Sequence, residues 1–171
     1  MAIAVFGSVN IDIAARVKRL PSPGETCHAV GHSIGLGGKG ANLAGAPTRL
    51  YQGAVRFGAA IGEDGFGTDA LRLLDGYGID TGHVEKRGGE GTGMALIHVD
   101  DEARTTITVV AGANMAWGHH GPPATLFEGA AVALFQLETP LEAVAAAMRS
   151  ARDAGCIAIL DPAPAPEVDI N

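Results

Sequence analysis

The sequence predicts an α/β fold, a doubly wound and mostly parallel sheet that carries a small antiparallel β-lid. Three observations support this prediction. Short apolar runs end at glycine or polar residues, which is typical of strands buried on both faces of a parallel sheet. A strand–helix–strand pattern occupies residues 131–162. Two further segments, residues 12–35 and 92–111, mix polar and apolar residues around a turn, as half-exposed hairpins do.

The first strand is predicted near the N-terminus. The run "IAVFG", residues 3–7, is apolar and ends at a glycine, so we expect it to lie inside the sheet. Further along, "DGFGTDALRLLDGYG", residues 64–78, places apolar residues at helical spacing and ends in glycines. We therefore expect an amphipathic helix packed against the sheet.

The two hairpins are predicted to form the lid. Residues 12–35 are interrupted by the proline turn "LPSPGE", and residues 92–111 place β-branched runs on either side of the turn "DDEA". One face of such a lid carries alternating apolar residues, among them Ile107 and Val109. Exposed apolar patches of this kind usually pair, so the sequence predicts a homodimer formed through the lid.

The C-terminal third predicts the clearest unit. The run "AVALFQL", residues 131–137, is a buried strand, and "CIAIL", residues 156–160, is the next one. Between them Thr139 is predicted to cap a helix, with Pro140 at its first position and Glu142 completing a Thr-x-x-Glu capping box.

The composition argues against several classes of partner. A formal net charge of -7 over 171 residues disfavours nucleic acid and anionic membranes. Cys27 and Cys156 lie far apart without a C-x-x-C pair, and the apolar start is too short for a signal peptide or a membrane span. We therefore expect a cytoplasmic protein. His119 and His120 are adjacent, so we expect their side chains to diverge and predict no metal site.

A glycine-rich loop, "GLGGKGANLAG", occupies residues 35–45. A Walker A loop reads G-x-x-x-x-G-K-[ST], but Ser33 stands where its first glycine should be and Gly40 where its hydroxyl residue should be. A triphosphate loop is therefore disfavoured. Pro47 stands inside the helix expected after this loop, which predicts that the helix is short or kinked.

Polar side chains follow the predicted strands at their carboxyl ends, where open α/β sheets bind ligands. The amides, carboxylates and ammonium group suit a polyhydroxylated ligand, because each sugar hydroxyl both donates and accepts. The backbone of Gly37 and Gly38 lets a ligand approach closely. The candidate side chains are Asn10, Asp12, Lys39, Asn42 and Glu138. Two other interpretations stay open from the residues alone, Asn10 as a turn cap and Glu138 as a first-turn charge that complements a helix dipole.

Eight short segments together resemble the ribokinase branch of the PfkB carbohydrate kinase family over about residues 3–165. They are "SVNID", "PSPGET", "GGKGAN", "GEDGFG", "TGMALIHVDDEARTTI", "AGAN", "LFQLETP" and "ILDPAPA". The resemblance implies a ribokinase-like α/β domain, incomplete here, with a lid that pairs with that of a second subunit. It also implies that the five side chains above, with the glycines, hold the hydroxyls of a ribose-like sugar.

The same resemblance implies that the chemistry of phosphate transfer is absent from this chain. In that family, an Asn-x-x-Glu motif that helps to organise Mg²⁺ and a Gly-Ala-Gly-Asp motif that supplies an anion site and the catalytic base follow the segment that "DPAPA" resembles. Neither motif occurs in the 171 residues. We therefore expect ATP and Mg²⁺ to serve the full-length family, but no site for them and no catalytic residue here.

Two function classes remain open. One is an ATP-dependent sugar kinase, seen as its sugar-binding half and inactive alone. The other is a non-catalytic carbohydrate-binding or interaction remnant of that fold. The sequence is compatible with a fragment, a miscalled reading frame or a decaying gene. An NAD-type Rossmann domain is a poorer match, because "VFGSVNID" lacks the second and third glycines of the dinucleotide fingerprint.

Overall fold

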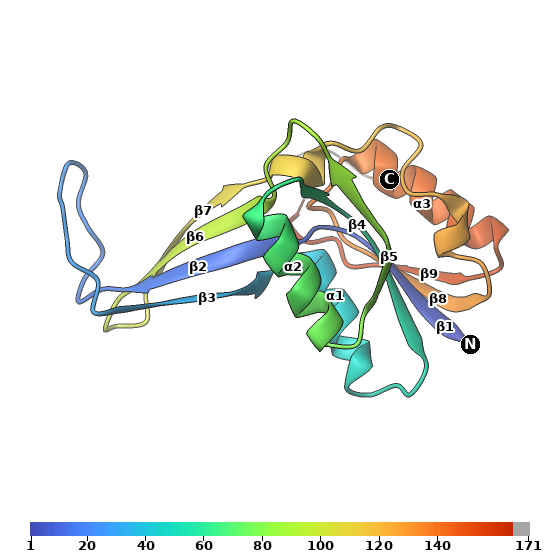
Figure 1. The fold of residues 1–171 in the computed structure, drawn as a ribbon, viewed down its shortest axis with the longest axis horizontal. Helices are drawn as coiled ribbons and strands as arrows, with labels where there is room; N and C mark the ends of the chain where they lie inside the picture. Colours follow the sequence, from blue (N-terminus) through green and yellow to red (C-terminus); the bar gives the residue numbers. More distant parts are fainter. Residues whose placement is uncertain (166–171) are drawn as a thin grey trace.

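The computed structural model describes residues 1–165 and contains two sheets (Figure 1). The larger sheet has the strand order β5-β4-β1-β8-β9, and every neighbouring pair in it is parallel. Its strands are β1 (Ala2–Phe6), β4 (Ala54–Gly62), β5 (Asp80–Arg87), β8 (Ala130–Phe135) and β9 (Ile157–Leu160). The predicted α/β class with a parallel sheet is confirmed.

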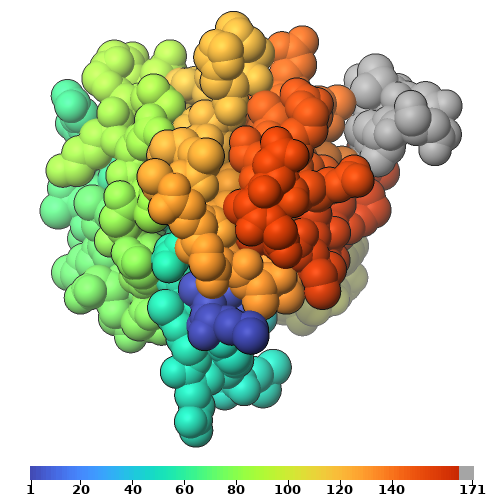
Figure 2. All heavy atoms as spheres, turned by 90° about the vertical axis from the view of Figure 1, so that its right-hand side faces the viewer, coloured from blue at the N-terminus to red at the C-terminus, as the bar shows by residue number. Residues whose placement is uncertain are grey.

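Strand β1 lies at the centre because its apolar side chains serve both faces of the sheet. Val5 belongs to the hydrophobic cluster under helices α1 (Lys39–Thr48) and α2 (Gly65–Gly76), whereas Phe6 belongs to the cluster under α3 (Leu141–Asp153). Helices therefore cover both faces, as a parallel sheet requires (Figure 1). The segment from β8 through α3 to β9, orange to red, covers part of the face shown in Figure 2, beside the green residues of earlier segments.

The second sheet extends away from the first and has the order β3-β2-β6-β7 (Figure 1). Its strands are β2 (Asn10–Arg16), β3 (Gly31–Gly37), β6 (Gly93–Val99) and β7 (Thr105–Val110). Both predicted hairpins are confirmed, since β2 pairs antiparallel with β3 and β6 with β7. The two hairpins join through a parallel pair, β2 with β6, a pairing that no local pattern predicted.

The predicted capping box at the start of α3 is wrong. The N-cap is Pro140, without a side-chain hydrogen bond, so the helix begins one residue later than expected. The Thr139 side chain is buried, and its Oγ1 has no hydrogen-bond partner within residues 1–165. Because Pro140 takes the cap position, Thr139 lies one residue too early to reach the first-turn amides.

The predicted helix of residues 64–78 is confirmed as α2 and begins with a strong cap. Asp64 is its N-cap and accepts hydrogen bonds from the backbone N–H of Gly67 (2.7 Å) and from both the N–H and the hydroxyl of Thr92 (2.8 and 2.6 Å). Burial would raise the pKa of Asp64, but these hydrogen bonds outweigh it and hold the pKa below its usual range. Asp64 thus ties the start of α2 to the start of the β6 hairpin.

The structure confirms the expected effect of Pro47 on its helix but not the expected separation of His119 and His120. Pro47 stands in the last turn of α1, and the ten-residue helix ends directly after it, so the short helix is confirmed. The expectation that His119 and His120 diverge is wrong, since their ring centroids lie 3.8 Å apart. They occupy a turn, where adjacent side chains do not alternate as they do in a strand.

No helix in residues 1–165 has the length and apolar character needed to cross a bilayer.

Candidate functional site

The candidate site lies where the carboxyl ends of β1 and β8 meet the glycine loop. Phe6 and Phe135 are register partners at the ends of these strands, so the segments that follow them emerge side by side. Residues 7–10 lead from β1 into β2, and residues 37–40 lead from β3 into α1. Segments from both sheets therefore converge at one point.

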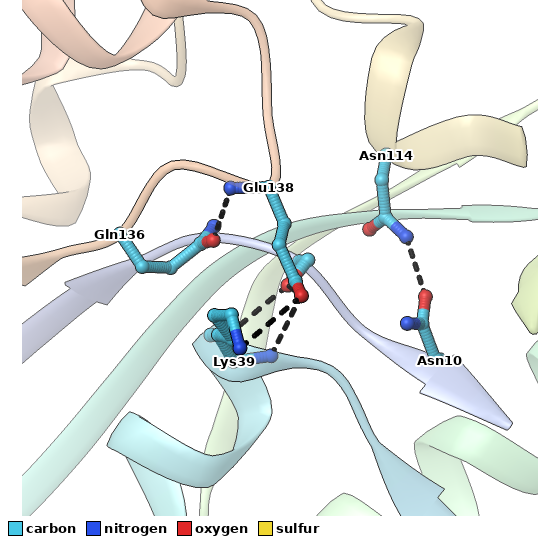
Figure 3. Close-up of polar contacts among 7 residues, drawn as sticks. Asn10, Lys39, Asn114, Gln136 and Glu138 are labelled. Carbon is cyan, nitrogen blue, oxygen red and sulfur yellow. Dashed lines mark hydrogen bonds and ion pairs between the residues drawn. The ribbon is translucent and has the colours of Figure 1, made fainter. Parts of the chain in front are cut away.

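Glu138 is the centre of the polar network at this point (Figure 3). Its Oε2 accepts hydrogen bonds from the Ser8 hydroxyl (2.6 Å) and from the backbone N–H of Lys39 (2.9 Å), and its Oε1 lies 3.7 Å from the Lys39 ammonium. Its own backbone N–H donates to the side-chain carbonyl of Gln136, which is fully buried. Glu138 thereby fixes the first residue of α1 against the end of β8.

Neighbouring backbone and side-chain atoms pack closely against the glycines of the loop. A Cβ on Gly40 would lie 2.5–2.6 Å from the backbone of Gly7 and Ser8, so only glycine allows this contact. Gly38 adopts a φ of 89°, which favours glycine, immediately before α1 begins. A Cβ on Gly37 would lie 2.0–2.3 Å from the carboxyl atoms of Asp12, so that carboxylate rests directly on Gly37.

Asn10 and Asn114 form a second buried pair beside the first network (Figure 3). The Asn114 side-chain NH₂ donates to Asn10 Oδ1 (2.8 Å) and to the Val9 carbonyl (3.0 Å), while Asn114 Oδ1 accepts from the Val9 N–H (2.9 Å). Asn114 comes from η1 (Gly112–Met115), a short 3₁₀ helix that follows β7. Asn10 is therefore held by a residue from a distant segment. The alternative role, in which Asn10 only caps the turn after the first strand, does not include this contact.

Asp12 stands close to this network without joining it. Burial raises the pKa of Asp12, and the negative charge of Glu138 raises it further. Within residues 1–165 its carboxylate accepts no hydrogen bond. A partly desolvated acceptor that keeps its lone pairs free of protein donors is suited to a ligand hydroxyl.

A cavity of about 670 Å³ opens over Asn10, Lys39, Asn114 and Glu138. Its polar side is formed by these four residues. Its apolar side includes Val109 of β7, Met115 at the end of the 3₁₀ helix that follows β7, Leu137 just after β8, and Leu141 of α3. An apolar wall opposite a few convergent polar groups is the usual form of a small-molecule site.

The structure gathers most of the predicted site residues, but not all of them. Asn10, Lys39 and Glu138 line the cavity, and Asp12 rests on Gly37 next to the loop. Asn42 is exposed on α1 and lines a different, smaller cavity of about 280 Å³ with Leu36, Arg49 and Tyr77. Asn42 therefore lies apart from the other candidates.

Three residues of the network were not singled out from the sequence. Ser8, Asn114 and Gln136 each lie inside a segment that carries the family resemblance, "SVNID", "AGAN" and "LFQLETP". These family motifs could have pointed to the three residues. The contacts that give these residues their roles span up to 130 positions in the chain, and no local pattern reports such a contact.

The glycine loop and Lys39 make their contacts within the chain. The glycine loop packs against the backbone after β1, and the Lys39 ammonium is engaged by Glu138. Within residues 1–165, no three His, Cys, Asp or Glu side chains form a group that could hold a metal ion.

Comparison with known proteins identifies the family. The sequence profile of the pfkB family of carbohydrate kinases matches residues 2–170. The chain belongs to this family. It is 38% identical to the ribokinase of Schizosaccharomyces pombe, over 95% of this chain and 54% of that protein.

Solved kinases share the fold. Ribokinase from Thermotoga maritima superimposes with a TM-score of 0.85 at 32% identity, over 99% of this chain and 55% of that one. The structure of Arabidopsis thaliana ribokinase complexed with ribose and ATP superimposes with a TM-score of 0.83 at 32% identity, over 94% of this chain and 52% of that one. The chain spans about half the length of the curated relatives that it matches.

Proposed function

We propose that this chain is the sugar-binding half of a ribokinase-like carbohydrate kinase and that alone it binds a sugar without transferring phosphate. The observation that carries the proposal is the cavity whose polar side joins Glu138, Lys39 and Asn10. A relative whose structure is described as a complex with ribose and ATP supports a ribose-like ligand. ATP, with Mg²⁺, is the expected phosphate donor of the complete kinase.

The site suits a sugar because its two sides match the two surfaces of a sugar ring. Asp12 and Glu138 supply acceptors for hydroxyl protons, and Lys39 and Asn10 supply donors for hydroxyl oxygens. The apolar wall, with Val109 and Met115, offers a surface for the C–H groups. In this proposal Gly37 and Gly38 let the backbone approach the sugar, and Asn42 contributes only if it reaches the sugar from its present position on α1.

Sugar binding without transfer follows from what phosphoryl transfer requires. The reaction depends on positioning the phosphate and on stabilising its charge, and we infer that the groups that do so lie outside this chain. We therefore expect a weak sugar complex, with a dissociation constant of roughly 1 mM, near -4 kcal/mol. The weakness reflects a site open to water on the phosphate side.

Ligand-observed NMR or calorimetry with ribose, fructose and a nucleoside tests the sugar site. We expect saturable binding of the best ligand, which Asp12→Ala abolishes. Asp153→Ala is the matched control, since Asp153 is an exposed aspartate at the end of α3, at the opposite edge of the sheet. Asn42→Ala measures separately whether the role implied by the family resemblance holds.

Two results would contradict the proposal. Absence of binding at tens of millimolar sugar, or binding indifferent to Asp12→Ala, would remove the sugar site. Sugar-dependent release of ADP from ATP by this chain, abolished by Asp12→Ala, would show that it is a complete kinase. A chain that binds sugar and never transfers phosphate, even joined to its kinase partner half, would instead be the non-catalytic carbohydrate-binding protein.

We also propose that the protein is a cytoplasmic homodimer paired through the second sheet, which would then act as a lid. Ile107 and Val109 are each more than half exposed on one face of that sheet. Apolar residues on an open sheet gain free energy by pairing. Light scattering across micromolar concentrations should report a dimer that Ile107→Lys dissociates, whereas a strictly monomeric mass would rule out the lid dimer.

A further inference from the structure

Gln136 is a polar side chain that is completely buried beside the candidate site. It directly follows the last residue of β8 and is 0% exposed. Its side-chain carbonyl accepts the backbone N–H of Glu138 (Figure 3). Its NH₂ group has no hydrogen-bond partner within residues 1–165. Buried polar groups are almost always paired, so an unpaired one needs a physical explanation.

The contact with Glu138 decides which way the Gln136 amide points. The Glu138 N–H is a donor, so only the carbonyl end of the amide can face it, and the NH₂ end is turned toward Gly7. A Cβ on Gly7 would lie 2.7 Å from that nitrogen and 2.8 Å from the Cα of Gly40. The Gln136 side chain therefore reaches the point where the end of β1 meets the first turn of α1.

Gln136 can act on the cavity only through its neighbour. The cavity wall after β8 is formed by residues 137–141, and Gln136 lies just before them. Glu138 belongs to that wall, and its Oε2 accepts from the Ser8 hydroxyl (2.6 Å) and the Lys39 N–H (2.9 Å). The carboxylate meets both donors only if the Glu138 backbone keeps its direction, and the Gln136 carbonyl is the group that bonds the N–H of that backbone.

An apolar side chain of similar size would fill the same space without leaving a donor unpaired. A buried amide that is only half satisfied lowers stability. Its presence is explained if the amide carbonyl performs a task that an apolar side chain cannot perform. Holding the Glu138 N–H is such a task.

We propose that Gln136 is a positioning residue of the sugar site. By fixing the backbone of Glu138, it holds the carboxylate on Ser8 and Lys39 and thereby sets the affinity for the sugar. The effect on affinity rests on the proposed function, whereas the effect on the carboxylate does not.

Two substitutions separate positioning from packing, with ribose affinity measured by calorimetry. Gln136→Met keeps a long side chain but removes the carbonyl, so affinity should fall about tenfold or more. Its melting temperature should change by less than about 3 °C, because the unpaired donor is removed as well. Gln136→Glu keeps an oxygen that accepts the Glu138 N–H but buries a charge, so the melting temperature should fall while affinity stays within about threefold.

Gln52→Met is the matched control, because Gln52 is exposed in the turn between α1 and β4. It should change neither affinity nor melting temperature.

Hydrogen exchange at the Lys39 amide reports on the carboxylate without any sugar. This amide donates to Glu138 Oε2, so Gln136→Met should speed its exchange at least about tenfold. The amide of Asn42 donates to the Gly38 carbonyl (3.0 Å) in the first turn of the same helix, and its exchange should not change.

Three results would overturn the proposal. The first is unchanged exchange at Lys39 in Gln136→Met, whatever its affinity. The second is faster exchange at Lys39 with unchanged affinity, since the carboxylate would then serve the helix and not the ligand. The third is a loss of affinity in Gln136→Glu as large as in Gln136→Met, since Gln136 would then act by packing alone. If the unaltered chain binds no sugar, the proposed function fails, and exchange at Lys39 alone decides whether Gln136 positions Glu138.

Discussion

Glu138 holds Lys39 at two points, its backbone N–H at 2.9 Å and its side-chain ammonium at 3.7 Å. One carboxylate therefore satisfies the first amide of helix α1 and positions the lysine that lines the cavity. The helix has no side-chain N-cap of its own, since its N-cap is Gly38. Glu138 takes over that task from 99 residues away.

Replacing Glu138 should therefore affect both stability and ligand binding. Glu138→Ala removes two charge-assisted hydrogen bonds and should lower the free energy of unfolding by about 2–4 kcal/mol. Glu138→Gln keeps an acceptor and should cost about half as much, while releasing the lysine. Urea unfolding measures both variants. Glu142→Gln on the exposed first turn of α3 is the control, and equal losses for Glu138→Gln and Glu142→Gln would contradict the assigned role.

Three glycine substitutions separate binding from folding. Gly37→Ala would push its Cβ into the Asp12 carboxyl group, which can rotate away, so sugar affinity should fall about tenfold or more with little loss of stability. Gly35→Ala on the same strand meets nothing within 4 Å and should change neither. Gly40→Ala meets backbone that cannot yield and should destabilise the fold. Paired calorimetry and thermal melts measure all three, and unchanged affinity in Gly37→Ala would refute the contact with Asp12.

We expect that Asp12, which we propose binds the sugar, lowers the folding stability of the chain. Its pKa is raised by burial and by Glu138, so at neutral pH its ionised form disfavours folding. Asp12→Asn should raise the melting temperature by about 1–3 °C, an effect kept small by solvent screening of a half-exposed group. The gain should vanish below about pH 4, where aspartate itself is protonated. A melting temperature that falls at neutral pH would contradict the predicted strain.

Asp64 should give the opposite pH dependence. Its pKa is lowered in the folded chain, so its contribution is present above the unfolded pKa and is lost as pH falls through the folded value. Asp64→Ala should cost about 2–4 kcal/mol at neutral pH, from the lost cap and the hydrogen bonds to Thr92. The difference between the two proteins should narrow on acidification. Chemical unfolding at neutral and acidic pH measures it, and a constant difference would be the contrary result.

Several elements could be read from local patterns because short-range physics fixes them. The apolar run of β1, the two hairpins with their turns, and helix α2 all depend on residue types within a few positions. Strands β4 and β5 had no separate prediction, although β4 is the longest strand and is buried beside β1. Its sequence, "AVRFGAAIG", offers mostly small residues with an arginine inside, which is a weak strand signal.

In the candidate site too, local patterns predicted some residues and missed the contacts between distant ones. The sequence pointed to Asn10, Asp12, Lys39 and Glu138 because they follow strand ends or lie in the glycine loop. It gave no reason to pair Asn10 with Asn114, which lies 104 positions away, nor did it signal that Asn42 would line another cavity. Thr139 was misread as a cap because capping patterns do not report which neighbour takes the cap position.

The sequence by itself determined the family, the parallel sheet and the types of residue at its edge, because periodicity, turns and motifs are properties of neighbouring residues. Only the tertiary structure decided that Glu138 would anchor α1, that Asp12 would lie against Gly37, and that Ile157 and Ile159 would be exposed. Each of these depends on packing between segments far apart in the chain. Distances and burial at such contacts follow from how both sheets close against their helices, which no single segment encodes.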